Sequence, residues 1–286
     1  MRICIVQKKI EWANPTLNRT EIEHFINDYL ENQKEKCSEE IDLIVLPEMF
    51  STGFCPNPQN LAEEKKGSSI YPSVQWMREI AKRYDCAVCG SIAIKENISY
   101  YNRLFFVYPD GEFKFYDKRH LFSYSGEDKN FTAGENQVVV DYKGFKLLLQ
   151  ICYDLRFPIF SRNKIIPKNS LTDSQETYLY DAIIYVAAWP QSRIAAWDKL
   201  LLARAIENCC YVVGVNCVGE MKQQELGDKK IFYSGNSTIV DYIGNSIISC
   251  NSDGKEEIQM GCIDLESLNI FRKNFPVLKD SDSFKL

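Results

Sequence analysis

The chain has 286 residues and a net charge of −5, from 34 basic against 39 acidic residues. This weak acidic balance gives no general attraction for nucleic acid or anionic lipid. No apolar run approaches the roughly 18 residues of a membrane span, and the apolar stretch at residues 1–7 is too short for a secretory signal. We therefore expect a cytoplasmic protein with no nucleic-acid or membrane partner.

The cysteines and histidines argue against a disulfide framework and a metal site. The eleven cysteines are an odd number without framework spacing, so reduced thiols are expected. Cys86 and Cys89 have the spacing of redox and metal motifs, but their segment is apolar and holds no second pair, which favours core packing. Because His24 and His120 are the only two histidines, we expect no histidine-rich metal site.

In the first half of the chain, apolar patterns predict alternating strands and helices. Residues 1–7 form a first strand, and Asn14-Pro15 supplies an N-cap and a first-turn proline for a helix. The later elements are a strand over 43–46, a helix over 69–84, strands over 86–94 and 103–108, and a hairpin turn at 109–111 leading into 112–116.

In the second half, a run of apolar residues over 147–151 predicts a buried strand that ends at Cys152. Residues 163–178 are polar and turn-rich, and we expect an exposed loop there. The remaining elements are a strand over 183–188, a helix over 198–208, a strand over 211–215 and a hairpin turning at 243–245. Residues 271–286 show no core pattern and are expected to pack on a neighbour. These elements together predict one mixed α/β domain.

Three reactive side chains follow predicted strands: Glu48, Lys118 and Cys152. Taken singly, the charges are compatible with solvated surface residues and the cysteine with a buried thiol. Taken together, they supply what amide hydrolysis through a thiol requires. A carboxylate accepts the thiol proton, and a cation stabilises the developing oxyanion. A cysteine–histidine pair with His120 or His24 is the rival, but neither histidine has the Asn or Asp setting typical of a thiol protease.

Three segments that contain these residues resemble the signature motifs of the nitrilase superfamily of carbon–nitrogen hydrolases. They occur in that family's order and are Leu46-Pro47-Glu48-Met49, Tyr116-Asp117-Lys118-Arg119-His120-Leu121-Phe122 and Ile151-Cys152-Tyr153-Asp154-Leu155-Arg156-Phe157-Pro158. Other segments are similar to the omega-amidase branch, namely Ala188-Trp189-Pro190, Ser192-Arg193, Ala203-Arg204-Ala205-Ile206-Glu207-Asn208 and the closing stretch from Phe271 to Leu286. The resemblance covers nearly the whole chain, from the first strand to Asp264.

The resemblance implies an α-β-β-α sandwich with two mixed sheets in a single domain over 1–286, with a C-terminal extension at about 265–286. It implies no cofactor, a small-molecule amide as substrate, and assembly as a homodimer. It also implies that Cys152 attacks the amide carbon and forms a thioester, while Glu48 carries protons. Lys118 and the backbone N–H of Tyr153 would hold the oxyanion. Glu127 matches the second glutamate that assists in many members, and an exposed loop charge is the alternative.

Omega-amidases act on monoamides of short dicarboxylic acids such as 2-oxoglutaramate, so such a site needs a cation for the distal carboxylate. Arg193 is our candidate, although a solvated arginine is equally compatible with the sequence. Trp189 and Tyr124 are further substrate-binding candidates. Asp154 and Arg156 are expected to fix the turn after the nucleophile, by an ion pair or by backbone bonds. Two alternative functions stay open: another amide-cleaving enzyme such as a carbamoylase, and an inactive scaffold that only binds partners.

Overall fold

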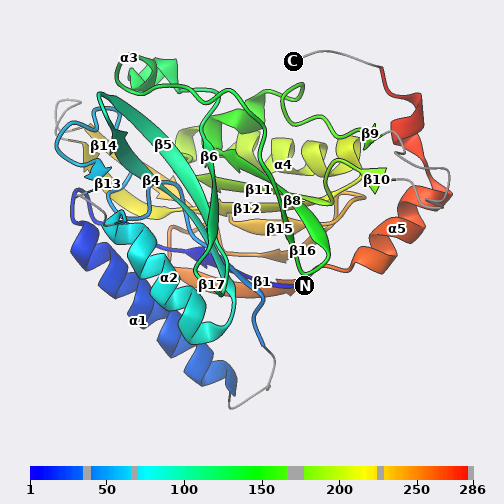
Figure 1. The fold of residues 1–286 in the computed structure, drawn as a ribbon, viewed down its shortest axis with the longest axis horizontal. Coiled ribbons are helices and arrows are strands. Elements are labelled where there is room, and N and C mark those ends of the chain that lie inside the picture. Colours follow the sequence, from blue (N-terminus) through cyan, green and yellow to red (C-terminus); the bar gives the residue numbers. More distant parts are fainter. Residues whose placement is uncertain (35–39, 66–69, 167–176, 224–228, 283–286) are drawn as a thin grey trace.

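The computed structural model describes residues 1–34, 40–65, 70–166, 177–223 and 229–282. Two β-sheets lie at its centre, with helices on both outer sides (Figure 1). The first sheet has the spatial order β17 (Glu257–Cys262), β1 (Arg2–Gln7), β2 (Leu43–Val45), β4 (Ala87–Glu96), β5 (Ser99–Val107) and β6 (Phe113–Asp117), with β3 (Glu63–Glu64) paired to β4. The second sheet has the order β16 (Ser246–Ser249), β15 (Thr238–Val240), β12 (Tyr211–Asn216), β11 (Ala182–Ala187), β8 (Phe145–Ile151) and β7 (Val139–Tyr142).

Both sheets are mixed. Strands β1, β2 and β4 run parallel in the first sheet, as do β8, β11 and β12 in the second. Antiparallel strands flank these central triplets. Two further pairs of strands lie outside the main sheets: β9 (Ile165–Ile166) with β10 (Thr177–Tyr178), and β13 (Val218–Gln223) with β14 (Lys229–Ser234). The predicted α-β-β-α sandwich with two mixed sheets is confirmed.

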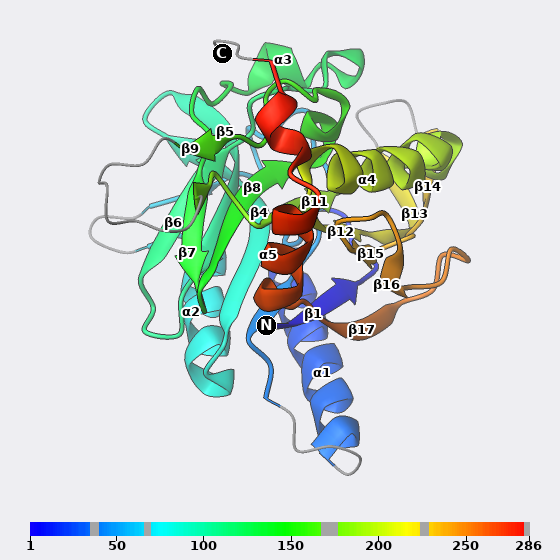
Figure 2. The ribbon, with the colours of Figure 1, turned by 90° about the vertical axis from the view of Figure 1, so that its right-hand side faces the viewer.

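The α-helices of the described residues are α1 (Pro15–Lys34), α2 (Pro72–Tyr84), α3 (Glu127–Asn130), α4 (Ile194–Asn208) and α5 (Leu265–Asn274). Three of them, α1, α2 and α4, cover the outer faces of the two sheets. Helices α1 and α2 share a core with the outer face of the first sheet, and α4 shares one with the outer face of the second. In Figure 2, α5 lies in front of the two sheets, with the start of β1 at its lower end.

The period of two along each strand explains why the core has layers. Alternate residues of a strand face opposite sides of the sheet, so Ile3 and Ile5 pack between the sheets while Cys4 faces α1 and α2. The same rule separates the two cysteines of the CxxC spacing. Cys86 packs in the outer cluster and Cys89 between the sheets, both fully buried. Their predicted role in core packing is confirmed.

Most predicted elements are present, with shifted ends. The Asn14 side chain caps α1 by accepting the N–H of Leu17 at 3.2 Å, as predicted. Helix α2 begins at Pro72 rather than at 69, a position outside the described residues. Helix α4 begins four residues before its predicted start, because a 3₁₀ turn (Gln191–Arg193) after Pro190 leads directly into it.

The segment over 163–178 is not simply an exposed loop. Asn163 is buried, and its amide donates to the carbonyl oxygens of Tyr180 and Asn208 at 3.1 and 3.0 Å. The ends of the segment form the antiparallel pair β9–β10, and positions 167–176 lie outside the described residues. The sequence did not predict this ordered structure, because polar residues usually indicate an exposed loop. Here the buried polar side chains are instead paired with backbone groups.

The described part of the C-terminal segment packs on its own chain, and its packing on a neighbouring subunit stays a prediction. Arg272 is 2% exposed and forms an ion pair with Asp181 at 2.7 Å. Its guanidinium also donates to the carbonyl oxygens of Tyr180 and Cys209. The sequence concealed this contact because a buried arginine does not follow an apolar pattern. Residues 283–286 lie outside the described part of the chain.

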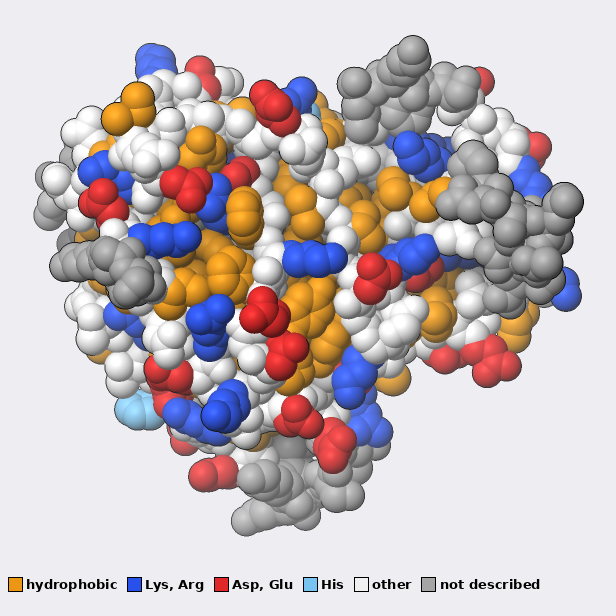
Figure 3. All heavy atoms as spheres, viewed as in Figure 1, with side chains coloured by type: hydrophobic (Ala, Val, Ile, Leu, Met, Phe, Trp, Pro, Cys, Tyr) orange, Lys and Arg blue, Asp and Glu red, His pale blue; other side chains and the backbone are white. Residues whose placement is uncertain are grey.

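The surface agrees with the weak net charge. On the face seen in Figure 3, basic and acidic side chains are interspersed rather than collected into a field of one sign. Within the described residues, no helix combines the length and apolarity that a bilayer span requires.

Candidate active site

Cys152 stands on a sharp turn at the end of a core strand. Strand β8 is buried between neighbouring strands, and Cys152 follows it with a φ of +45°, a left-handed conformation uncommon for non-glycine residues. A 3₁₀ turn over Cys152–Arg156 follows. The buried Asp154 carboxylate accepts the N–H of Ile151 at 2.9 Å and the hydroxyl of Tyr116 at 2.7 Å. The prediction that Asp154 fixes this turn through backbone bonds is therefore confirmed.

His120 belongs to the same support and not to the sulfur. Its Nδ1 lies 2.8 Å from an Asp154 oxygen, and its ring stacks on Phe157 with centroids 3.9 Å apart. The charged groups that act on the Cys152 thiol are Glu48 and Lys118. The rival reading of a cysteine–histidine pair finds no support in this geometry.

Glu48 follows β2 and is almost fully enclosed, with 1% of its surface exposed. The backbone of its turn is held by the N–H of Met49, which donates to the Ser91 hydroxyl at 2.9 Å. Oxygen Oε1 of Glu48 accepts the Lys118 ammonium at 2.9 Å. Oxygen Oε2 accepts the backbone N–H of Ala188, at the end of β11, at 2.9 Å. The carboxylate is thus fixed from both sheets.

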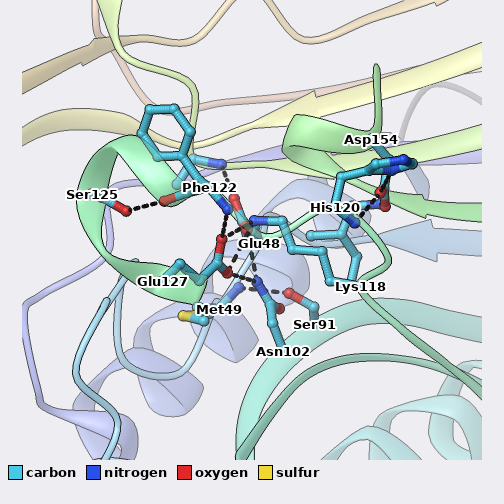
Figure 4. A network of polar contacts seen from close by, with 12 residues as sticks. Glu48, Met49, Ser91, Asn102, Lys118, His120, Phe122, Ser125, Glu127 and Asp154 are labelled. Atoms are coloured by element: carbon cyan, nitrogen blue, oxygen red, sulfur yellow. Dashed lines mark hydrogen bonds and ion pairs between the residues drawn. The ribbon is translucent and has the colours of Figure 1, made fainter. Parts of the chain in front are cut away.

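Lys118 and Glu127 complete a buried cluster with Glu48 (Figure 4). Lys118 follows β6, and its Nζ lies 2.9 Å from Glu48 and 2.9 Å from Glu127. Glu127 opens α3 and is 0% exposed, with one oxygen accepting the N–H of Phe122 at 2.6 Å. The alternative of an exposed loop charge at Glu127 is wrong. The amide of Asn102, from β5, also donates to both glutamates.

The protonation states follow from burial and neighbouring charge. Burial raises the pKa of the Cys152 thiol, the Glu48 charge raises it further, and Lys118 only partly opposes them, so the pKa lies well above its usual range. Burial alone would lower the pKa of Lys118, but the charges of Glu127 and Glu48 outweigh it and raise that pKa. The resting cluster therefore holds a neutral thiol beside an ammonium group.

Cys152 and Lys118 reach a cavity of about 700 Å³. Aromatic side chains form much of its wall, including Phe54, Phe122, Trp189 and Tyr233. The cations Arg156, Arg193 and Lys230 also line it, and the described lining contains no Asp or Glu. An anion in this cavity would meet positive charge without a competing carboxylate on the wall.

The predicted substrate-binding residues Arg193, Trp189 and Tyr124 all line this cavity. The Arg193 guanidinium lies over the rings of Phe122 and Tyr124, at 5.2 and 5.9 Å from their centroids. Arg156 corrects our expectation, because its side chain lies over the Trp189 ring at 4.9 Å and faces the cavity. It is placed to meet a ligand rather than only to fix the turn.

Sequence reasoning missed two parts of this site. Asn102 lies just before the predicted start of a strand at 103, and β5 in fact begins at Ser99. A polar residue within a buried strand was the available signal, because such a group needs a partner. The β13–β14 hairpin was also missed, although Lys230 and Tyr233 from β14 line the cavity. Its polar sequence gives little periodicity.

A two-sheet sandwich with a glutamate, a lysine and a cysteine converging at strand ends defines an enzyme that hydrolyses amides. The family model for carbon-nitrogen hydrolases matches residues 2–273. The chain therefore belongs to the carbon–nitrogen hydrolase family, the nitrilase superfamily, and is an amidase of that family.

Relatives with assigned names agree with this. The chain is 36% identical over 288 residues to the omega-amidase YafV of Yersinia enterocolitica, with 100% of this chain and 98% of the relative covered. It is 32% identical to the 2-oxoglutaramate amidase of Bacillus subtilis, with 97% and 96% covered. A solved CN-hydrolase superfamily protein from Xanthomonas campestris, with an arsenic adduct in its active site, has a TM-score of 0.82 and 34% identity, with 100% of this chain and 98% of that chain covered.

Proposed function

We propose that this protein is a cysteine-dependent omega-amidase, which cleaves the terminal amide of short dicarboxylic acid monoamides such as 2-oxoglutaramate. The observation that carries the proposal is that Cys152 borders a cavity with cationic walls and has Glu48 and Lys118 behind it. The relatives named omega-amidase and 2-oxoglutaramate amidase support the same substrate class.

In the proposed reaction, the Cys152 sulfur attacks the amide carbon as its proton passes to the Glu48 carboxylate. The amide oxygen becomes an oxyanion, which the Lys118 ammonium and the Tyr153 backbone N–H stabilise. The carbon–nitrogen bond then breaks, and the proton held by Glu48 leaves with the nitrogen as ammonia. A thioester remains on Cys152.

Water completes the cycle. Glu48 takes a proton from a water molecule, whose oxygen attacks the thioester carbon and forms a second tetrahedral species. Collapse of that species restores the Cys152 thiol and releases the dicarboxylate. Glu127 keeps Lys118 oriented throughout through its contacts at 2.9 and 3.1 Å. In the net reaction, one amide and one water give one carboxylic acid and one ammonia.

The charge of the cavity supports an anionic substrate. Arg156 and Arg193 are half-buried, and neither has a carboxylate partner within the described residues. Lys230, in contrast, is already paired with Glu220 at 2.8 Å. A free carboxylate at the far end of a short substrate would pair with one of these arginines. The guanidinium group binds a carboxylate well because it can donate two parallel hydrogen bonds.

The test is ammonia release measured across 2-oxoglutaramate, succinamate, a carbamoyl-amino acid and a simple nitrile. We expect turnover of the two monoamides and little of the others. Preference for the carbamoyl compound would replace the proposal with the carbamoylase alternative. Failure to release ammonia from any of them, with no thioester trapped on Cys152, would favour a scaffold. The homodimer stays a prediction, and sedimentation of the purified protein checks it.

A further inference from the structure

We propose that Asn102 is a positioning residue that, with Lys118, determines which oxygen of Glu48 carries the proton. This inference rests on the proposed role of Glu48 as the proton carrier. Asn102 belongs to β5 and is 0% exposed. Its contacts connect it to the other three members of the buried cluster, and Figure 4 shows its side chain directed toward the two glutamates.

The side-chain amide of Asn102 serves two carboxylates at once. Its Nδ2 donates to Oε1 of Glu48 at 2.8 Å and to Oε1 of Glu127 at 3.2 Å. Its backbone oxygen accepts the N–H of Lys118 at 3.0 Å. A single residue thus fixes the backbone of the cation and holds the two anions on either side of the ammonium group.

The orientation of this amide is set by the chemistry around it. Oδ1 of Asn102 is buried and accepts no hydrogen bond from the described part of the chain. Turning the amide over would direct that carbonyl oxygen at two carboxylate oxygens and leave the NH₂ group without an acceptor. Only the orientation with Nδ2 toward the glutamates provides donors for the acceptors that surround it.

The donors around Glu48 differ between its two oxygens. Oε1 faces both the Lys118 ammonium and the Asn102 amide, at 2.9 and 2.8 Å. A proton placed on Oε1 would point at donors and find no acceptor, so that position is unfavourable. Oε2 instead meets the single backbone N–H of Ala188.

The donor that contacts Oε2 also acts on the nucleophile. Besides burial, the Glu48 charge raises the pKa of the Cys152 thiol, and the Ala188 N–H, which donates to Oε2 at 2.9 Å, lowers it. The proton taken from the thiol therefore goes to Oε2, from which it can reach the leaving nitrogen. Asn102 contributes by occupying Oε1 with a donor that adds no charge to a cluster of two carboxylates and one ammonium.

Asn102→Ala tests this role, with the pH dependence as the decisive readout. We expect kcat to fall about 10- to 100-fold with little change in KM, the size of losing a hydrogen bond to a charged group. The acid limb of the kcat/KM profile should move to higher pH, because a lost donor destabilises the charged carboxylates. The matched control is Asn163→Ala, which removes an equally buried amide that donates only to backbone carbonyls. It should lower the melting temperature without moving the profile.

A measurement without substrate separates this inference from the proposed function. The rate of Cys152 alkylation by iodoacetamide, followed by mass spectrometry, should reach its midpoint at higher pH in Asn102→Ala than in the wild type. If Asn102→Ala fails to fold, Asn102→Ser, which can donate to only one glutamate, should show a shift in the same direction. A folded variant with unshifted alkylation and an unshifted acid limb would overturn the role of Asn102. A wild type that alkylates as expected but releases no ammonia from 2-oxoglutaramate would overturn the proposed function instead.

Discussion

Two charged regions use charge in opposite ways: the buried cluster at and behind the cavity wall (Glu48, Lys118 and Glu127, the floor) and the half-buried arginines that line the cavity (Arg156 and Arg193, the mouth). At the floor, Glu48, Lys118 and Glu127 are almost fully enclosed, and each charge is matched by a partner within hydrogen-bonding distance. At the mouth, Arg156 and Arg193 are half-buried, and they lie over aromatic rings instead of carboxylates. The floor is complete before substrate arrives, whereas the mouth lacks an anion that the substrate can bring.

This contrast separates chemistry from recognition. Paired charges in a dry site cost no reorganisation during the reaction, which is what stabilisation of a transition state requires. Cations without a partner at a wetter site are screened by salt and water. They are therefore suited to binding and selectivity rather than to stabilising a transition state. Substitutions at the floor should therefore reduce turnover, and substitutions at the mouth should change the substrate preference.

Cys152→Ala should have the largest effect, because it removes the proposed nucleophile while leaving the mouth unchanged. We expect turnover to fall by roughly four orders of magnitude or more, as in other enzymes that lose a covalent nucleophile. Binding of succinate, measured by calorimetry, should persist. The control is Cys262→Ala, an exposed cysteine on β17, which should keep full activity. Ammonia release by the Cys152 variant at the wild-type rate would contradict the assignment.

Lys118→Ala should lower turnover about 100- to 1000-fold, because it removes a proposed oxyanion donor. It also leaves Glu48 and Glu127 buried without their cation, so the free energy of unfolding should fall by about 3–5 kcal/mol. Kinetics and urea unfolding check the two effects separately. Lys129→Ala, on the exposed side of α3, is the matched control and should change neither quantity. Near-normal turnover in Lys118→Ala would remove the residue from the mechanism.

The pH dependence of thiol alkylation tests the electrostatics of the floor. Because burial and the Glu48 charge raise the pKa of Cys152 well above its usual range, the thiolate forms only as the pH rises through that value. The alkylation rate should increase about tenfold per pH unit while the thiol is mostly protonated, and continue to rise above pH 9, roughly where a free cysteine levels off. Glu48→Gln removes a negative charge and should move the curve to lower pH. A plateau below pH 8 in the wild type would contradict the raised pKa.

The smallest effect is expected at the mouth. Arg193→Ala should lower the preference for 2-oxoglutaramate over its neutral ester about tenfold, the size of a partly exposed charge-assisted hydrogen bond. The loss should appear mainly in KM, since the group lies away from the reacting bond. Arg193→Lys retains the charge and should recover part of the preference. An unchanged preference in Arg193→Ala, together with a reduced one in Arg156→Ala, would transfer the role to Arg156.

The parts of this structure that sequence predicts are those with local patterns. The apolar run before Cys152 predicts β8, and Asn14-Pro15 predicts the start of α1, because both depend on neighbouring residues. The convergence of Glu48, Lys118 and Cys152 was accessible because each follows a strand, and ligand sites form at strand ends. That their strands belong to two different sheets was not visible in the sequence.

The parts that were missed depend on contacts between distant residues. The role of Asn102 depends on its hydrogen bonds to Glu48 and Glu127, which lie 54 and 25 positions away in the sequence. Arg156 was expected to stabilise the turn that contains it. Its contact with Trp189 arises only because the end of β11 places that ring under the guanidinium. No pattern within a short window contains such pairs, because tertiary packing alone creates them.

The ion pair between Arg272 and Asp181 has a consequence for truncated forms of the protein. Asp181 immediately precedes β11, and the opposite end of that strand delivers the Ala188 N–H to Glu48. Cutting the chain before Arg272 would leave the buried Asp181 carboxylate without its counter-ion. This would destabilise the start of β11. Helix α5 is thus connected, through β11, to the carboxylate that carries the proton in the proposed reaction.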